Sequence, residues 1–129
     1  MYKTGILNSE ISKVLSDLGH TDTIIIADCG LPIPDGVKKI DLALTFGHPS
    51  FEEVFNLVKA HMKIEQLTIA NEMIKQNSAL YVKLLAENID MVTESHEKLK
   101  MYSKDVKAII KTGEATPYAN AILSSGVLF

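Results

Sequence analysis

The stretch LGHTDTIIIADCGLPIP, residues 18–34, contains the segment that decides the fold. Its centre, Thr23 to Ala27, is a run of β-branched and small apolar residues, which predicts a short buried strand. His20 comes before this strand and Asp28 follows it, while Gly30 and the prolines beyond it indicate a turn. A strand needs neither the histidine nor the aspartate in order to fold. Both are therefore candidate site residues.

A helix is expected just before this strand. Apolar residues recur there at i, i+3, i+4 and i+7, as on one helical face: Ile11, Val14, Leu15 and Leu18. Asn8 or Ser9 is expected to cap the start of the helix, and Gly19 to take a left-handed conformation after its end. His20 then lies just beyond the C-terminus of the helix, where the partial negative charge favours a protonated imidazole.

Helical and strand-like segments alternate along the rest of the chain. Strands are expected over 39–44, 66–70, 90–93, 108–111 and 119–123, and helices over about 50–62, 78–87 and 95–101. This alternation predicts a single α/β domain over residues 1–129, with a largely parallel sheet.

Composition narrows the kinds of ligand. The 129 residues are 47% hydrophobic and 22% charged, and the formal net charge of -3 shows no basic surface for nucleic acid. All 13 positively charged residues are lysines, so the bidentate arginine grip on phosphate is missing, although lysine also binds phosphate. A neutral polar ligand is the better expectation.

Other features bear on location and cofactors. No apolar stretch approaches the roughly 18 residues of a membrane span, and the N-terminus does not resemble a signal peptide. Cys29 is the only cysteine, so we expect a protein of the reducing cytoplasm without disulfides. The four histidines lack a short metal-ligand spacing, and there is no glycine-rich phosphate loop, so no metal or nucleotide cofactor is predicted.

Candidate site residues follow the predicted strands. Ligands bind near the carboxyl ends of the strands in open α/β sheets, where Asp28 and His96 are expected. Each has a simpler interpretation. Asp28 could simply form a hydrogen bond within its own turn. His96 could simply be the first residue of a capped helix, and His20 could be a partly exposed residue at a helix end. Cys29 is interpreted as a small apolar filler rather than a nucleophile.

Tyr118 and Asn120 form a second candidate pair. They are expected to alternate along a strand and should therefore point to one face. A phenol and a carboxamide both donate and accept hydrogen bonds, which suits sugar hydroxyls. The same pair would also suit a subunit interface.

Five segments resemble the D-ribose pyranase family of sugar mutarotases, which is related to the fucose mutarotases. They are MYKTGILNSEIS, LGHTDTIIIADCGLPIPDGV, DLALTFGHPSF, SHEKLK and KTGEATPYANAILSSGV, and together they reach from one end of the chain to the other. The resemblance implies a three-layer α/β/α domain with a mostly parallel central sheet. It implies an isomerase that interconverts the pyranose and furanose forms of β-D-ribose without a cofactor.

The resemblance also assigns roles to residues. His20 would be the catalytic proton donor, while Asp28, His96, Tyr118 and Asn120 would bind the sugar. Family members resemble one another in forming rings, here expected to be a decamer of two pentameric rings, with sites completed across subunit boundaries. His20 would then meet strand-end residues that it could not reach within one subunit. The alternatives are a fucose-type mutarotase and a non-catalytic sugar-binding oligomer.

Overall fold

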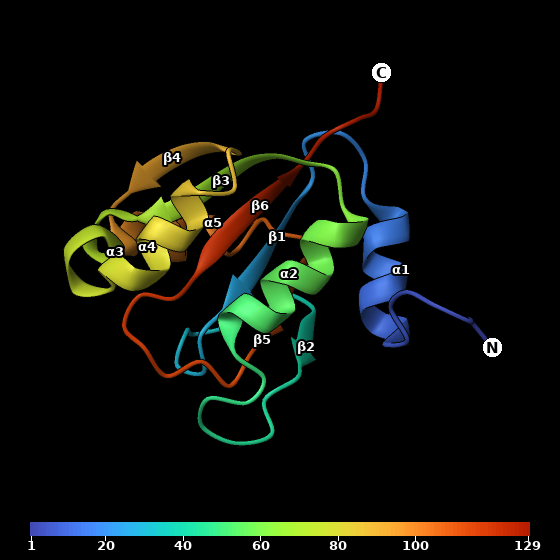
Figure 1. The fold of residues 1–129 in the computed structure, drawn as a ribbon, viewed down its shortest axis with the longest axis horizontal. Coiled ribbons are helices and arrows are strands. Elements are labelled where there is room, and N and C mark those ends of the chain that lie inside the picture. Colours follow the sequence, from blue (N-terminus) through green and yellow to red (C-terminus); the bar gives the residue numbers. More distant parts are fainter.

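The fold is built on one six-stranded sheet, seen in a computed structural model that describes all 129 residues (Figure 1). The strands lie in the order β2-β5-β1-β6-β3-β4. β6 is antiparallel to both its neighbours, β1 and β3, while the other strand pairs are parallel. The predicted α/β fold with a mostly parallel sheet is therefore confirmed. The strand bounds are β1 Thr23–Ala27, β2 Lys39–Asp41, β3 Ile64–Ala70, β4 Asp90–Glu94, β5 Ala108–Lys111 and β6 Ala121–Ser125.

Helices cover the two faces of the sheet unequally. The larger core contains side chains from four helices on one face, and the smaller core contains Leu99 of the fifth helix together with Leu31 of the loop after β1. The result is three layers, one of which is a single helix and a loop. The helices are α1 Ser9–Asp17, α2 Phe51–His61, α3 Asn71–Gln76, α4 Ser78–Leu85 and α5 His96–Tyr102.

β1 is the central element of both cores. Ile24 and Ile26 belong to the larger core and Ile25 to the smaller one, and all three are fully buried. Successive strand residues point to opposite faces, so a strand covered on both sides must be apolar at every position. This is why the Thr23–Ala27 run predicts the strand at its observed bounds.

Several predicted boundaries differ from the structure. The strand expected over 39–44 ends at Asp41, the last strand begins at Ala121 rather than at residue 119, and α3 was not predicted. α3 has six residues and no side-chain cap, so it lacks the signals that mark a helix start. Ser50 is the N-cap of α2, and its hydroxyl accepts from the Glu53 N–H.

The end of α1 also differs from expectation. Asn8 is the N-cap, but Gly19 has no positive φ; the left-handed residue is Thr21, with φ of 71°. Leu18 is extended and ends the helix, and the Gly19 N–H donates to Asp22 Oδ2 at 2.8 Å. The side chain of Asp22 thus closes the turn that a left-handed glycine would otherwise make.

The strands begin and end at two opposite edges of the sheet. We call the edge where the five mutually parallel strands end the carboxyl edge, and the edge where they begin the amino edge. β6 runs the other way, so it starts at the carboxyl edge and ends at the amino edge. None of the helices combines the length and apolar character that crossing a membrane requires.

Candidate active site

Asp28 and Asn120 form a hydrogen-bonded pair at the carboxyl edge. The Asn120 carboxamide donates from Nδ2 to Asp28 Oδ2 at 2.9 Å, and its Oδ1 accepts from the Asp28 backbone N–H at 2.9 Å. The second carboxylate oxygen of Asp28 accepts from the Gly30 N–H at 2.9 Å. Asp28 therefore makes the turn expected of an aspartate before glycine, and it also faces Asn120. Asn120 is fully buried, whereas Asp28 is half-buried.

Tyr118 and His96 form a second pair at the same edge. Their rings meet edge to face, with centroids 5.1 Å apart and planes at 80°. The His96 backbone N–H donates to both carboxylate oxygens of Glu72 at 3.1 Å. The ring Nδ1 of His96 is buried and has no hydrogen-bond partner in the chain. Buried polar atoms are rarely left unpaired, so this nitrogen marks a place where a hydroxyl or water would bind.

The expectation that Tyr118 and Asn120 alternate along a strand is wrong. Both precede β6, and Tyr118 is left-handed with φ of 56°. The Asn120 N–H donates to the Tyr118 carbonyl at 2.9 Å, which closes a tight turn. The segment that joins the two side chains is therefore a loop over the end of the sheet. The pair still lies at the edge where Asp28 lies, because β6 begins there.

His20 lies at the amino edge, on the loop between α1 and β1. The turn is fastened to the end of β6: the Thr21 N–H donates to the Ser125 carbonyl and the Ser125 N–H to the Asp22 carbonyl. The Nε2 atom of His20 is 3.2 Å from both carboxylate oxygens of Glu65. The two side chains are 49% and 51% exposed, so this contact is largely solvated.

The structure separates the five predicted residues into two groups. Asp28, Asn120, Tyr118 and His96 lie at the carboxyl edge, and His20 lies at the amino edge. The five residues of β1 alone span about 16 Å between the two edges. One subunit therefore does not bring His20 to the other four residues.

Three glutamates that were not predicted lie beside these groups. Glu65 faces His20 and Glu72 binds the backbone of His96, while Glu114 accepts hydrogen bonds in the loop before Tyr118. Glu72 could have been found, because the residues that follow a parallel strand lie at the carboxyl edge. Glu65 is 45 residues from His20, and no sequence spacing indicates their contact.

Cys29, the residue after Asp28, is a half-buried free thiol at the carboxyl edge. Its backbone N–H donates to the carbonyl of Glu114 at 2.9 Å, so the residue helps to join two loops through its main chain. No group of three or more histidine, cysteine or acidic side chains is arranged to hold a metal ion.

The chain belongs to the RbsD / FucU transport protein family, whose model matches residues 1–128. It is 70% identical over 129 residues to a D-ribose pyranase of Staphylococcus saprophyticus, with the whole of both chains covered. It is 54% identical over 131 residues to a D-ribose pyranase of Bacillus cereus, again with complete coverage of both.

The chain is also similar to solved structures. The chain is similar to Bacillus subtilis RbsD complexed with D-ribose, with a TM-score of 0.94, 49% identity and complete coverage of both chains. A fucose mutarotase from Streptococcus pneumoniae, in complex with L-fucose, gives a TM-score of 0.81 at 24% identity. It covers 99% of this chain and 100% of its own, and it shows a shared fold.

Proposed function

We propose that this protein is a D-ribose pyranase, an isomerase that interconverts the pyranose and furanose forms of β-D-ribose. The polar cluster at the carboxyl edge carries the proposal. It combines a carboxylate, a buried carboxamide, a phenol and an imidazole, which together suit a small polyhydroxy ligand. Relatives named D-ribose pyranase match the chain over its full length.

The carboxyl-edge cluster is the sugar-binding half of the proposed site. Asn120 and Asp28 hold each other in place, so Asp28 reaches the site with its orientation already set. Tyr118 and the ring of His96 stand against each other at the same edge. Because these groups are ordered by contacts within one subunit, little conformational freedom remains to be lost on binding.

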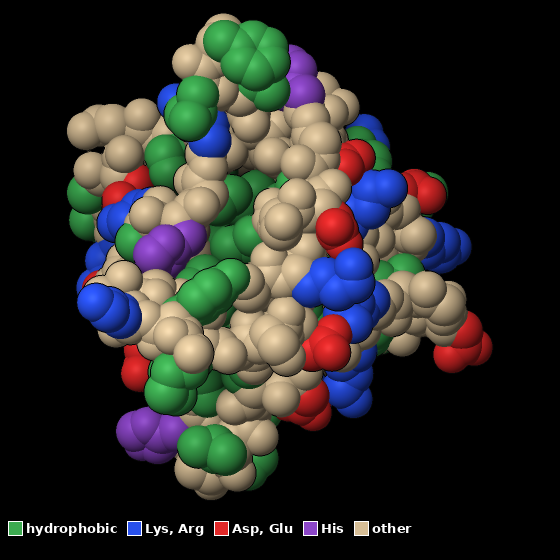
Figure 2. Space-filling model, turned by 90° about the vertical axis from the view of Figure 1, so that its right-hand side faces the viewer, with side chains coloured by type: hydrophobic (Ala, Val, Ile, Leu, Met, Phe, Trp, Pro, Cys, Tyr) green, Lys and Arg blue, Asp and Glu red, His purple; other side chains and the backbone are tan.

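We propose that His20 of one copy completes the site of another. His20 lies at the opposite edge, so a copy must present its amino edge to the carboxyl edge of a neighbour, in a head-to-tail contact. Large hydrophobic side chains protrude at both ends of the molecule (Figure 2). Leu44 and Phe46 are 87% and 81% exposed on the loop after β2, and Leu128 and Phe129 are exposed after β6. Burial of these side chains between copies would stabilise the contact.

The proposed chemistry is opening and reclosure of a hemiacetal. A base removes the proton of the anomeric hydroxyl while His20 protonates the ring oxygen, so that the bond between C1 and the ring oxygen breaks and an open-chain aldehyde forms. A different hydroxyl then attacks C1 and gives its proton to the deprotonated His20. The protonated base returns its proton to the carbonyl oxygen, which becomes the new anomeric hydroxyl as the other ring closes. Asp28 or His96 accepts the anomeric proton, directly or through a water molecule. Tyr118 and Asn120 hold the remaining hydroxyls so that the open chain stays folded.

Histidine suits the donor role because its ordinary pKa lies near neutrality, so it gives and regains a proton at cellular pH. A well-placed acid or base is worth about 10²- to 10⁴-fold in rate. His20→Ala should therefore remove most of the exchange while leaving ribose binding largely intact.

Saturation transfer in NMR between the pyranose and furanose signals of D-ribose tests this function directly. The native protein should accelerate exchange, and His20→Ala should not. If both proteins left exchange at its spontaneous rate, the protein would be a binding module, or its sugar would be another one, for which L-fucose is the first to try. Native-rate exchange with His20→Ala would remove this histidine from the mechanism.

For the assembly we propose a decamer of two pentameric rings, supported by the family resemblance and by the head-to-tail contact that the site requires. Sedimentation would measure the mass of the particle, and a monomeric particle would contradict it. We also propose a cytoplasmic location, which the free thiol of Cys29 suits.

A further inference from the structure

We propose that Glu114 is a positioning residue, whose carboxylate fixes the loop that presents Tyr118 and Asn120 to the sugar. The inference rests on the proposed function, since it concerns the same site. Glu114 does not touch the carboxyl-edge cluster itself. It acts through the backbone of residues 112–120, which joins β5 to β6.

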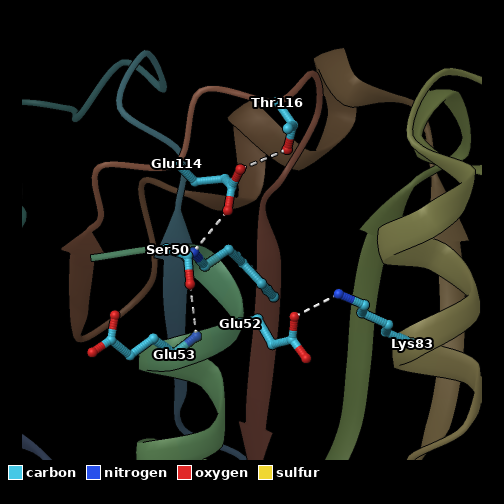
Figure 3. Close-up of polar contacts among 7 residues, drawn as sticks. Ser50, Glu52, Glu53, Lys83, Glu114 and Thr116 are labelled. Carbon is cyan, nitrogen blue, oxygen red and sulfur yellow. Dashed lines mark hydrogen bonds and ion pairs between the residues drawn. The ribbon is translucent and has the colours of Figure 1, made fainter. Parts of the chain in front are cut away.

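The carboxylate of Glu114 joins two segments (Figure 3). Oε1 accepts from the backbone N–H of Phe51, the first residue of α2, at 2.9 Å. Oε2 accepts from the hydroxyl of Thr116 at 2.9 Å. The first-turn N–H groups of a helix have no partner within the helix and favour negative charge, so α2 offers the carboxylate a fixed anchor.

The backbone of Glu114 is bound on the side of the sugar-binding aspartate. Its carbonyl accepts from the N–H of Cys29, the residue after Asp28, at 2.9 Å. Its N–H donates to the Thr112 hydroxyl at 3.1 Å, and that hydroxyl donates to the Ala27 carbonyl at 2.8 Å. Glu114 is thus held between the end of β1 and the start of α2.

Thr116 extends the same network towards Tyr118. The side chain of Asn77 donates to the Thr116 hydroxyl and to the Pro117 carbonyl, both at 2.9 Å. Tyr118 comes next and has a left-handed backbone conformation. This conformation is unfavourable in free energy for any residue that has a β-carbon. Such a conformation is kept only where contacts with the surrounding structure hold the residue in it. Here the contacts of residues 114–117 supply that constraint from one side, and the Asn120–Asp28 pair supplies it from the other.

The test compares Glu114→Ala and Glu114→Gln with a matched control, Glu52→Ala. Glu52 lies one residue after Phe51 in α2, and its exposed carboxylate pairs with Lys83 Nζ at 2.7 Å (Figure 3). Glutamine retains an acceptor for the Phe51 N–H and a group that can donate to Thr116. It should therefore rescue most of what alanine loses.

Two measurements are needed. We expect Glu114→Ala to raise the KM for D-ribose about tenfold or more with a smaller change in kcat, since Tyr118 and Asn120 bind rather than donate the proton. In the sugar-free protein it should also shift the NMR signals of the Asn120 side-chain amide. The second measurement needs no activity, so it tests Glu114 even if the proposed ribose reaction fails.

Thr116→Val removes only the hydroxyl and leaves the contact between Glu114 and Phe51. This variant replaces Glu114→Ala in the test if the alanine variant does not fold. We expect it to change the KM and the Asn120 amide signals in the same direction, but by less. A native KM and native Asn120 amide signals in the folded alanine or valine variant would overturn the proposal. A lowered melting temperature with both quantities unchanged would also overturn it, because Glu114 would then serve stability alone.

Discussion

The two edges of the sheet carry functional side chains in opposite ways. At the carboxyl edge, Asn120 is fully buried and makes two hydrogen bonds with Asp28. At the amino edge, His20 stands half exposed on a short turn, and its side chain pairs with the half-exposed Glu65. The binding half of the proposed site is thus complete within one subunit. The proposed proton donor, His20, is held in place by its turn and would meet the substrate of another copy in the proposed assembly.

The largest effect that follows from this separation is complementation between two inactive variants. His20→Ala has a damaged amino edge and Asp28→Ala a damaged carboxyl edge, so each alone should lose exchange. When the two are co-expressed in mixed rings, half of the edges of each kind are intact, and about one quarter of head-to-tail contacts pair two intact edges. The mixture should recover about one quarter of the native exchange rate in saturation transfer.

Mixing the two purified variants under conditions where the rings cannot exchange subunits is the control, and it should stay inactive. A co-expressed mixture with no exchange above either variant would mean that His20 acts within its own subunit. The loop after α1 would then have to move by more than the length of β1, and the separation of the edges would carry no functional meaning.

The next largest effect is on stability. Asn120→Ala leaves the backbone N–H of Asp28 without its acceptor, and leaving such a group unpaired typically costs about 1–3 kcal/mol. His20→Ala removes a solvated contact and should stay within about 0.5 kcal/mol of the native protein. Urea unfolding of both variants measures the difference, at one protein concentration, because assembly makes stability concentration-dependent. Equal losses would contradict the contrast between the edges.

How much of this arrangement could be predicted depends on the range of the contacts. The Thr23–Ala27 strand was predicted at its observed bounds, because full burial on both faces leaves a local signature of apolar residues. The helix expected over about 95–101 is α5, and its N-cap Ser95 accepts from the Lys98 N–H through the side-chain hydroxyl. Such features depend on residues a few positions apart.

The site was less predictable. The sequence indicates these residue types as candidates, but it predicts a strand where Tyr118 forms a turn. Its left-handed backbone depends on Asn120 meeting Asp28, 92 residues away, and on contacts from Asn77. The left-handed position at Thr21 was likewise misplaced at Gly19, since the Asp22 side chain competes with the usual glycine ending. Partners far along the chain hold the turn at Tyr118, and one sequence does not reveal them. At Thr21 the competing side chain is a near neighbour, three residues after Gly19.

A smaller effect is expected at Glu65. Its pair with His20 is about half exposed on both sides, and such pairs contribute about 0–1 kcal/mol. Glu65→Gln should therefore leave the urea midpoint nearly unchanged and lower sugar exchange far less than His20→Ala does. Saturation transfer on the two variants measures this. If Glu65→Gln lost as much exchange as His20→Ala, the carboxylate would itself belong to the proton-transfer machinery.

The smallest effect is expected at Glu97, the residue after His96, and it tests whether charge near the carboxyl edge is enough to affect the site. A hydrogen bond from Lys100, and then its positive charge, lower the pKa of Glu97 below its ordinary value of 4.5. The ionised form is favoured in the folded protein, so this small stabilisation is present above the ordinary pKa and is lost as the pH falls through the lowered one. Lys100→Met should raise the Glu97 pKa in an NMR titration. It should leave ribose exchange at the native rate, because the side chains of Glu97 and Lys100 pair with each other and make no hydrogen bond to the sugar-binding cluster. A reduced exchange rate would mean that the surface of α5 helps to hold His96, and that the binding half extends beyond its buried pairs.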